Sequence, residues 1–173
     1  MVNGESIESM SLRVITKIAN IPELQHLPIH DLESIPLGRL RKNATRLHAV
    51  CRYKRGVIKS NGVSPSDVRC IDIHPYALVE KWSRYTEFLL YHEYLHALGF
   101  SNHGRAFRNV ESLWPDKKAQ AMGNDFSRYL IEKSSKWLWT CISCDIRYPR
   151  SRRSNGRYRC RTCKNTLVDV ISS

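Results

Sequence analysis

The stretch His92-Glu93-Tyr94-Leu95-His96 decides the interpretation of this chain, because it places two imidazoles four residues apart. The surrounding residues, 76–98, have the apolar spacing of a helix, and Gly99 follows where a glycine commonly ends one. Side chains four residues apart project from one face of a helix, so both imidazoles can reach a single ion. We therefore expect His92 and His96 to be metal ligands, and the tyrosines of this helix, Tyr91 and Tyr94, to be core residues.

A third imidazole, His103, follows the end of the predicted helix. Because the chain can turn back at Gly99, His103 can approach the same ion. Catalytic zinc takes three protein ligands and keeps one position open, and Glu93 is placed to take a proton from water as it attacks a carbonyl. The pattern predicts a zinc peptidase site with ligands His92, His96 and His103 and with Glu93 as general base. The alternative is a pair of exposed helix histidines without a metal.

Four cysteines near the C-terminus form two C-x-x-C pairs, separated by 15 residues: Cys141, Cys144, Cys160 and Cys163. This spacing is typical of a zinc ribbon, in which a closed four-thiolate site replaces a core that so short a segment can hardly build. A hairpin turning at Asn155-Gly156 is expected between the pairs. The sequence thus predicts two zinc ions, one catalytic and one structural, with a redox role for the cysteine pairs as the weaker alternative. Cys51 and Cys70 are expected to be buried, reduced thiols.

Positive charge is concentrated in two segments of a chain whose formal net charge is +12. One segment is residues 136–173 and the other is residues 39–59, which contain no acid. Cations interleaved with aromatic side chains are what single-strand binding requires. We expect the C-terminal segment to contact nucleic acid through Arg147, Arg150, Arg152, Arg153, Arg157, Arg159 and Trp139. The alternatives are a solvated basic surface and aromatic residues that pack the core of the ribbon, Tyr158 foremost.

The predicted fold class is α+β, with a metallopeptidase domain over residues 1–135 and a zinc ribbon over residues 136–173. Apolar spacing indicates helices over 7–20, 76–98 and 116–133, with a short helix opening near His103. Short strands are expected over 45–53, 56–59 and 68–73. The peptidase domain is therefore a small sheet with an active-site helix.

The start of the chain has neither a basic segment nor an apolar segment of a secretory signal, and no apolar run approaches the ~20 residues that span a bilayer. A cytoplasmic protein without membrane contact is expected, which would be associated with the nucleoid or, in a eukaryote, located in the nucleus.

The stretch His103-Gly104-Arg105-Ala106-Phe107 resembles the H-G-x-x-F element of the SprT-like family, which includes the Spartan group of DNA–protein crosslink proteases. The ribbon is also similar, in Trp139-Thr140-Cys141 and Tyr158-Arg159-Cys160, so the resemblance covers residues 8–170. The insert between His96 and His103 is shorter than in many members. The resemblance implies a zincin core with His103 as third ligand, and a DNA-dependent protease. Its implied partners are single-stranded or junction DNA and proteins crosslinked to DNA.

Two other functions remain open. A zinc-dependent RNA hydrolase of the YbeY type uses three histidines in a related pattern but lacks a glutamate directly after the first, so Glu93 favours peptide chemistry. A non-catalytic DNA-binding protein could have kept the scaffold, which the intact set of ligands and base argues against.

Overall fold

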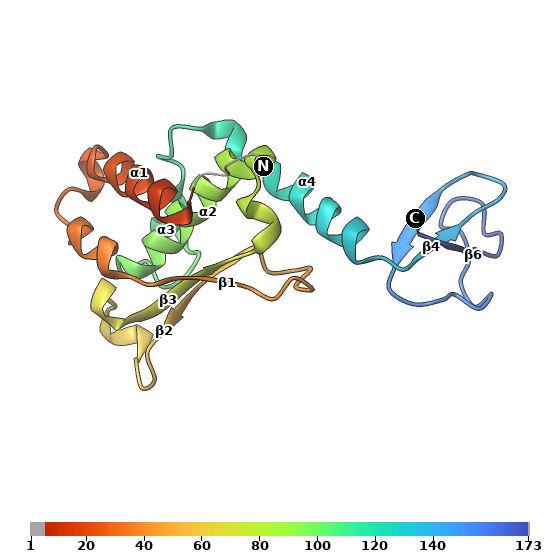
Figure 1. Ribbon diagram of the computed structural model, residues 1–173, viewed down its shortest axis with the longest axis horizontal. Helices are drawn as coiled ribbons and strands as arrows, with labels where there is room; N and C mark the ends of the chain where they lie inside the picture. Colours follow the sequence, from red (N-terminus) through yellow and green to blue (C-terminus); the bar gives the residue numbers. More distant parts are fainter. Residues whose placement is uncertain (1–5, 173) are drawn as a thin grey trace. The chain divides into compact units, whose positions relative to one another are not determined.

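The computed structural model describes residues 6–172, which form two compact units divided between Gly123 and Asn124 (Figure 1). The division lies inside helix α4 (Lys117–Ser134), ahead of the boundary that composition suggested at residue 135. Each unit contains its own three-stranded sheet. The fold is mixed α and β with two small sheets, in agreement with the predicted class. No helix among the described residues has the length and apolar character needed to cross a membrane.

The sheet of the first unit is built around β3 (Val68–Ile73), which pairs parallel with β1 (Leu37–Arg39) and antiparallel with β2 (Ala49–Tyr53). The expected alternation in β3 is confirmed, because Ile71 and Ile73 are fully buried while Asp72 between them is only half-buried. Strand β2 is an edge strand, so one side of its backbone is free of strand pairing.

Helix α2 (Ser83–Ala97) packs on β2 and β3, and α1 (Ile7–Ala19) packs against α2. Figure 1 shows these helices together with α3 (Arg105–Glu111) on one side of the sheet. Tyr91 and Tyr94 are fully buried, and the Tyr94 hydroxyl meets that of Ser11 at 2.6 Å. Their expected place in the core is confirmed. Because α2 is buried on most of its surface, its histidines are carried by the most enclosed element of the unit.

The active-site helix starts later than its apolar spacing predicted. Residues 75–82 form two separate 3₁₀ turns, Pro75–Leu78 and Glu80–Trp82, and α2 begins only at Ser83. Two local causes are visible: the Nδ1 atom of His74 accepts the Tyr76 N–H, and Val79 between the turns is extended. The His74 side chain therefore competes with the helical hydrogen-bond pattern at this point.

The strand predicted over 56–59 is wrong, and β2 begins at Ala49 rather than at residue 45. Gly56 has a φ of 88°, in the left-handed region that ends a strand, and the residues after it form a loop. Of the two isolated cysteines, Cys51 is buried as expected, whereas Cys70 is only half-buried.

The second unit is a sheet in the order β5-β4-β6, formed by β4 (Trp137–Thr140), β5 (Arg147–Arg150) and β6 (Val168–Ile171). The predicted turn at Asn155-Gly156 is present, with positive φ at both residues and a hydrogen bond from Arg157 N to Ser154 O. The predicted hairpin around it is wrong, because β5 pairs with β4 instead. The turn is held by Asp169, whose carboxylate accepts the backbone N–H groups of Ser154 and Asn155.

Candidate metal centres and a basic pocket

The three predicted histidine ligands converge in the first unit. His92 and His96 lie on α2, and His103 lies in the turn before α3. The Nε2 atoms of His92 and His96 are each 3.1 Å from the Nε2 atom of His103. The chain can return this quickly because Gly99 adopts a φ of 104° directly after the helix, where its N–H bonds the His96 carbonyl.

The opposite ring nitrogens of the helix histidines are already occupied. Nδ1 of His92 lies 2.6 Å from a carboxylate oxygen of Glu111, and Nδ1 of His96 lies 2.7 Å from the Phe100 carbonyl oxygen. Both acceptors require a proton on Nδ1, which leaves Nε2 with a lone pair for a metal. The other carboxylate oxygen of Glu111, which is 4% exposed, accepts from Arg108 at 2.8 Å.

Phe107 packs against the imidazole rings of all three histidines. Its ring centroid lies 4.8 Å from the centroids of His92, His96 and His103. The ring is 1% exposed, so it forms a buried wall against which the imidazoles stand. This contact gives a physical reason for a phenylalanine four residues after His103, as it occurs in the H-G-x-x-F element.

Glu93 lies in the same pocket as the three histidines, a cleft of about 340 Å³ that β2 also lines. One of its carboxylate oxygens accepts the Cys51 backbone N–H at 2.7 Å. The side chain is 6% exposed, and burial raises the pKa of Glu93 to about 7 despite that hydrogen bond. A carboxyl group in this state can accept and release a proton near neutral pH.

The histidine site fits a divalent transition metal. Its three ligand atoms lie within 4.8 Å of one another, and burial lowers the pKa of His96 to about 4 and lowers that of His92. Both rings are therefore held neutral, the state in which imidazole binds a metal. Three imidazoles without a carboxylate or thiolate ligand are a donor set that zinc accepts.

The four predicted cysteine ligands also converge, in the second unit, with their sulfur atoms within 4.8 Å of one another. Each pair closes in the same way: the N–H of the first cysteine bonds the carbonyl five residues later, Ile146 for Cys141 and Asn165 for Cys160. The residue after each pair, Asp145 or Lys164, has positive φ. The two pairs are thus equivalent knuckles.

The sulfur atoms of this cluster lie so close together that a bound cation would stabilise them as thiolates. The Sγ atoms of Cys141 and Cys163 are 3.3 Å apart. A hydrogen bond with Cys163 is the first cause that raises the pKa of Cys144 to about 12, while the backbone N–H of Cys163 lowers the pKa of Cys160 to about 6. Four sulfur atoms at this spacing, with backbone donors pointing at them, fit a tetrahedral zinc site.

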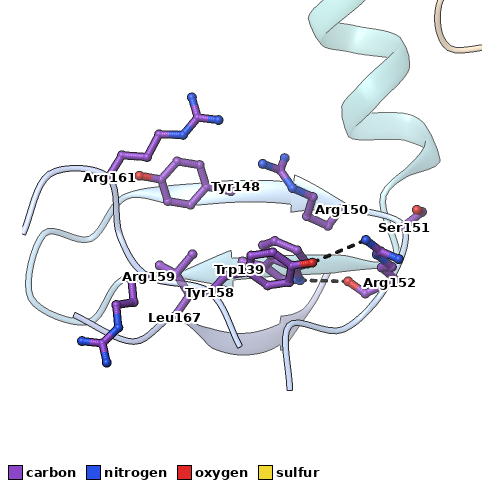
Figure 2. A pocket seen from close by; sticks show the side chains of 9 residues that line it. All are labelled: Trp139, Tyr148, Arg150, Ser151, Arg152, Tyr158, Arg159, Arg161 and Leu167. Atoms are coloured by element: carbon purple, nitrogen blue, oxygen red, sulfur yellow. Dashed lines mark hydrogen bonds between the residues drawn. The ribbon is translucent and has the colours of Figure 1, made fainter. Parts of the chain in front are cut away.

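A second pocket of about 340 Å³ lies on the ribbon itself (Figure 2). Aromatic side chains form part of it, and its arginines are Arg150, Arg152, Arg159 and Arg161. Trp139 and Tyr158 stack in it with ring centroids 4.3 Å apart, and the Arg152 guanidinium lies 3.5 Å from the Tyr158 hydroxyl oxygen. Cations around an aromatic surface are the chemistry expected of a nucleotide-binding pocket.

The burial of Trp139 and Tyr158 is the reverse of what the sequence predicted. Trp139 is 5% exposed and donates its indole N–H to the Arg152 carbonyl oxygen at 2.8 Å, whereas Tyr158 is 40% exposed. The prediction that Tyr158 packs the core is therefore wrong. Trp139 starts from β4 at the centre of the sheet, and Tyr158 stacks on it, so Tyr158 is the ring of the pair that is open to solvent.

The remaining predicted nucleic-acid residues fall into two groups. Arg147, Arg152, Arg153, Arg157 and Arg159 are exposed, and Arg150 is half-buried. Two of them rest on tryptophans, Arg150 at 5.1 Å from the Trp139 ring and Arg153 at 4.2 Å from that of Trp137. Only some of these cations line the pocket, which also includes Arg161.

Sequence reasoning missed several residues around the histidine site. Glu111 orients His92, the Phe100 carbonyl orients His96, and Tyr53 donates to the His96 carbonyl oxygen at 3.1 Å. Glu111 could have been found, because it follows Phe107 by one helical turn and is the single acid between His103 and Pro115. A backbone carbonyl leaves no signal in the sequence.

Comparison with known families identifies residues 135–170 as a SprT-like zinc ribbon domain. This match supports the SprT family and a zinc ion at the four cysteines, and it agrees with the cluster found in the structure. Neither the curated proteins nor the solved structures gave a match to the chain.

Proposed function

We propose that this chain is a zinc-dependent, DNA-associated endopeptidase of the SprT type, with ligands His92, His96 and His103 and with Glu93 as general base. The observation that carries the proposal is the convergence of three Nε2 atoms in the pocket that also holds the Glu93 carboxyl group. The SprT-like ribbon at residues 135–170 supports it, because the two modules occur together in the family that the sequence resembles.

A zinc ion held by the three imidazoles would supply Lewis-acid activation of a water molecule and of the scissile carbonyl. The protein's own residues carry the rest of the reaction. Glu93 accepts a proton from the attacking water and passes it to the leaving amine, and its raised pKa suits both transfers. Glu111 and the Phe100 carbonyl keep the His92 and His96 rings in the required tautomer.

An extended peptide has a place to bind beside this site. The Cys51 N–H bonds the Glu93 carboxylate and therefore points away from β3, the strand with which β2 pairs. The edge of β2 that has no strand partner thus faces the pocket that contains Glu93. Main-chain hydrogen bonds to a free strand edge bind an extended segment with little regard to its sequence. The pocket favours cleavage within unfolded segments, and so an endopeptidase.

The ribbon supports the association with DNA. Its pocket combines a partly exposed aromatic ring, Tyr158, with arginines at the rim, which is suited to a base and its neighbouring phosphates. Degradation of proteins crosslinked to DNA joins the two activities in one function, since DNA held by the ribbon brings its attached protein to the chain. This coupling rests on the family resemblance.

The test uses a protein–DNA conjugate and a free unfolded protein as substrates. The zinc-loaded chain should cleave both, and a chelator should stop cleavage. Glu93→Gln should retain zinc yet lower the rate by about 10²–10⁴, because an amide cannot accept the proton. Glu33→Gln, an exposed glutamate outside the pocket, is the matched control and should cleave normally. Cleavage by Glu93→Gln at the wild-type rate would refute the assignment of the base.

RNA hydrolysis is the second candidate, and the same proteins test it. The cation-rich ribbon would also bind RNA, but Glu93 beside the metal ligands favours attack on a carbonyl. Chelator-sensitive cleavage of RNA without cleavage of protein would replace the proposal.

A further inference from the structure

Lys59 is a charged residue in the histidine pocket that the proposed mechanism does not use. It lies in the loop after β2 and lines the pocket together with Glu93 and His96. Its Nζ atom lies 4.6 Å from the centre of the Tyr53 ring, and Tyr53 is tied to α2 by its hydrogen bond to the His96 carbonyl. The ring thus places the ammonium group of this exposed lysine at the pocket.

The charge of Lys59 is not neutralised within the described part of the chain. No ion pair there includes it. The carboxylate in the pocket belongs to Glu93, which accepts the Cys51 N–H.

The borders of the cleft carry more positive charge. The two segments that flank β2, residues 39–48 and 54–59, contain no acid. Arg46 is exposed and precedes Leu47, which lines the pocket. Arg52 contributes less, because it is paired with Asp72 at 2.5 Å. The field at the mouth of the cleft is therefore positive.

We propose that Lys59 binds an acidic side chain of the substrate beside the scissile bond, so that the cleft selects acidic segments. The inference rests on the proposed peptidase function. A peptide extended along β2 directs every second side chain to the same side. An aspartate or glutamate that reaches Lys59 gains an ion pair at the border of the pocket, whereas a lysine or arginine meets like charge.

A nucleic-acid phosphate could also meet this charge, but the position of Lys59 favours a peptide. It lies in the pocket that contains the general base, where a scissile bond must be placed for reaction. The ribbon, in contrast, offers arginines around an aromatic pocket, which matches phosphates and bases together. The same chain therefore separates a peptide-selective lysine from a nucleotide pocket.

The test compares peptides that differ only in having aspartate, alanine or lysine at the positions flanking the cleaved bond. The zinc-loaded full chain should cleave the aspartate peptide about tenfold faster in kcat/KM than the lysine peptide, a ratio that falls as salt is raised. Lys59→Glu should reverse the order. Lys118→Glu, which changes an exposed lysine outside the pocket, should keep it.

A binding measurement separates this inference from the proposed function. Fluorescence anisotropy with the Glu93→Gln protein should give tighter binding of the aspartate peptide, and adding Lys59→Glu should reverse that preference. Such a binding preference, together with no cleavage of any of the peptides by the zinc-loaded wild-type chain, would refute the peptidase and leave the role of Lys59 intact. Equal binding of the three peptides would overturn the inference. So would a Lys59→Glu variant that keeps the aspartate preference but loses affinity for an oligonucleotide.

Discussion

The two candidate zinc sites of this chain are built in opposite ways. The histidine ligands project from a unit with its own apolar core, where Ile71, Ile73 and Leu95 are fully buried. Their orientation is set by protein contacts, through Glu111 and the Phe100 carbonyl, and the site opens into a pocket. Such a site is organised before any metal arrives.

The cysteine ligands are themselves the core of their unit. Cys141 and Cys160 are fully buried, and among the described residues the hydrophobic cluster around them adds Trp139 and Leu167 as buried members. The two candidate sites therefore differ in what a metal could do there: the histidine site opens into a pocket, whereas a zinc ion at the cysteines would replace missing apolar contacts. Removing the metal should therefore have different consequences in the two units.

Loss of the cysteine metal should have the largest effect. Cys144→Ser, or a strong chelator, should unfold residues 136–172, because structural zinc contributes about 10–16 kcal/mol in comparable small domains. The first unit should stay folded. Amide hydrogen exchange followed along the chain measures both units in one experiment. A ribbon that keeps its protection without metal would break the comparison.

The next effect distinguishes the two stacked rings of the ribbon. Trp139→Ala removes a buried ring and should destabilise the ribbon by about 3–5 kcal/mol. Tyr158→Ala removes an exposed ring, so the ribbon should stay folded while affinity for a single-stranded oligonucleotide falls by about 1–3 kcal/mol. Thermal unfolding and oligonucleotide titration of both variants check this. Equal losses of stability would show that both rings belong to the core.

These rings also show where the sequence is informative and where it is not. The ligand sets could be predicted because metal chemistry fixes residue types and spacing, and the structure brings both sets together. Which of the two aromatic rings is buried depends on the register of the strands. Trp139 lies in the central strand β4, between Tyr148 of β5 and Asp169 of β6. Spacing along the chain carries no such information.

The helix boundaries show a similar limit. Apolar spacing over 76–98 continues through residues that form two 3₁₀ turns, because buried side chains such as Ala77 and Trp82 face the core from either type of helix. From the sequence, Lys59 is only one of several cations in the basic segment 39–59. Its place in the pocket depends on the loop after Gly56, where a strand was expected.

A smaller effect is expected at the residue that orients the first histidine. Glu111→Gln should lower zinc affinity of the histidine site by about 10–100-fold, because a neutral amide supports the imidazole less well than a carboxylate. Competition with a zinc-binding dye measures the affinity, and Glu33→Gln serves as the control. The cysteine site should be unchanged. Unaltered affinity would show that His92 needs no orienting carboxylate.

The smallest effect is expected for the exposed arginines of the ribbon pocket, whose replacement should change DNA affinity without changing the stability of the ribbon. Phosphate contacts release counterions, so the affinity for single strands falls with salt at a log–log slope of about −0.7 per contact. Replacing Arg152, Arg159 and Arg161 by alanine should make the slope shallower by about 2 and weaken binding to all sequences alike. Arg128→Ala, an exposed arginine of α4 outside the pocket, is the control.

Arg150 and Arg153 should behave differently from those three residues. Each guanidinium rests on a tryptophan of β4, so its removal exposes ring surface as well as deleting a charge. Their alanine variants should therefore lower the unfolding temperature of the ribbon, which the exposed set should not. A salt titration of a labelled oligonucleotide, run beside thermal unfolding, reads both properties. If the triple-alanine variant of Arg152, Arg159 and Arg161 binds the oligonucleotide with the wild-type salt dependence, the arginines around Tyr158 form a solvated surface. The ribbon then has only the structural role that its buried cysteines already indicate.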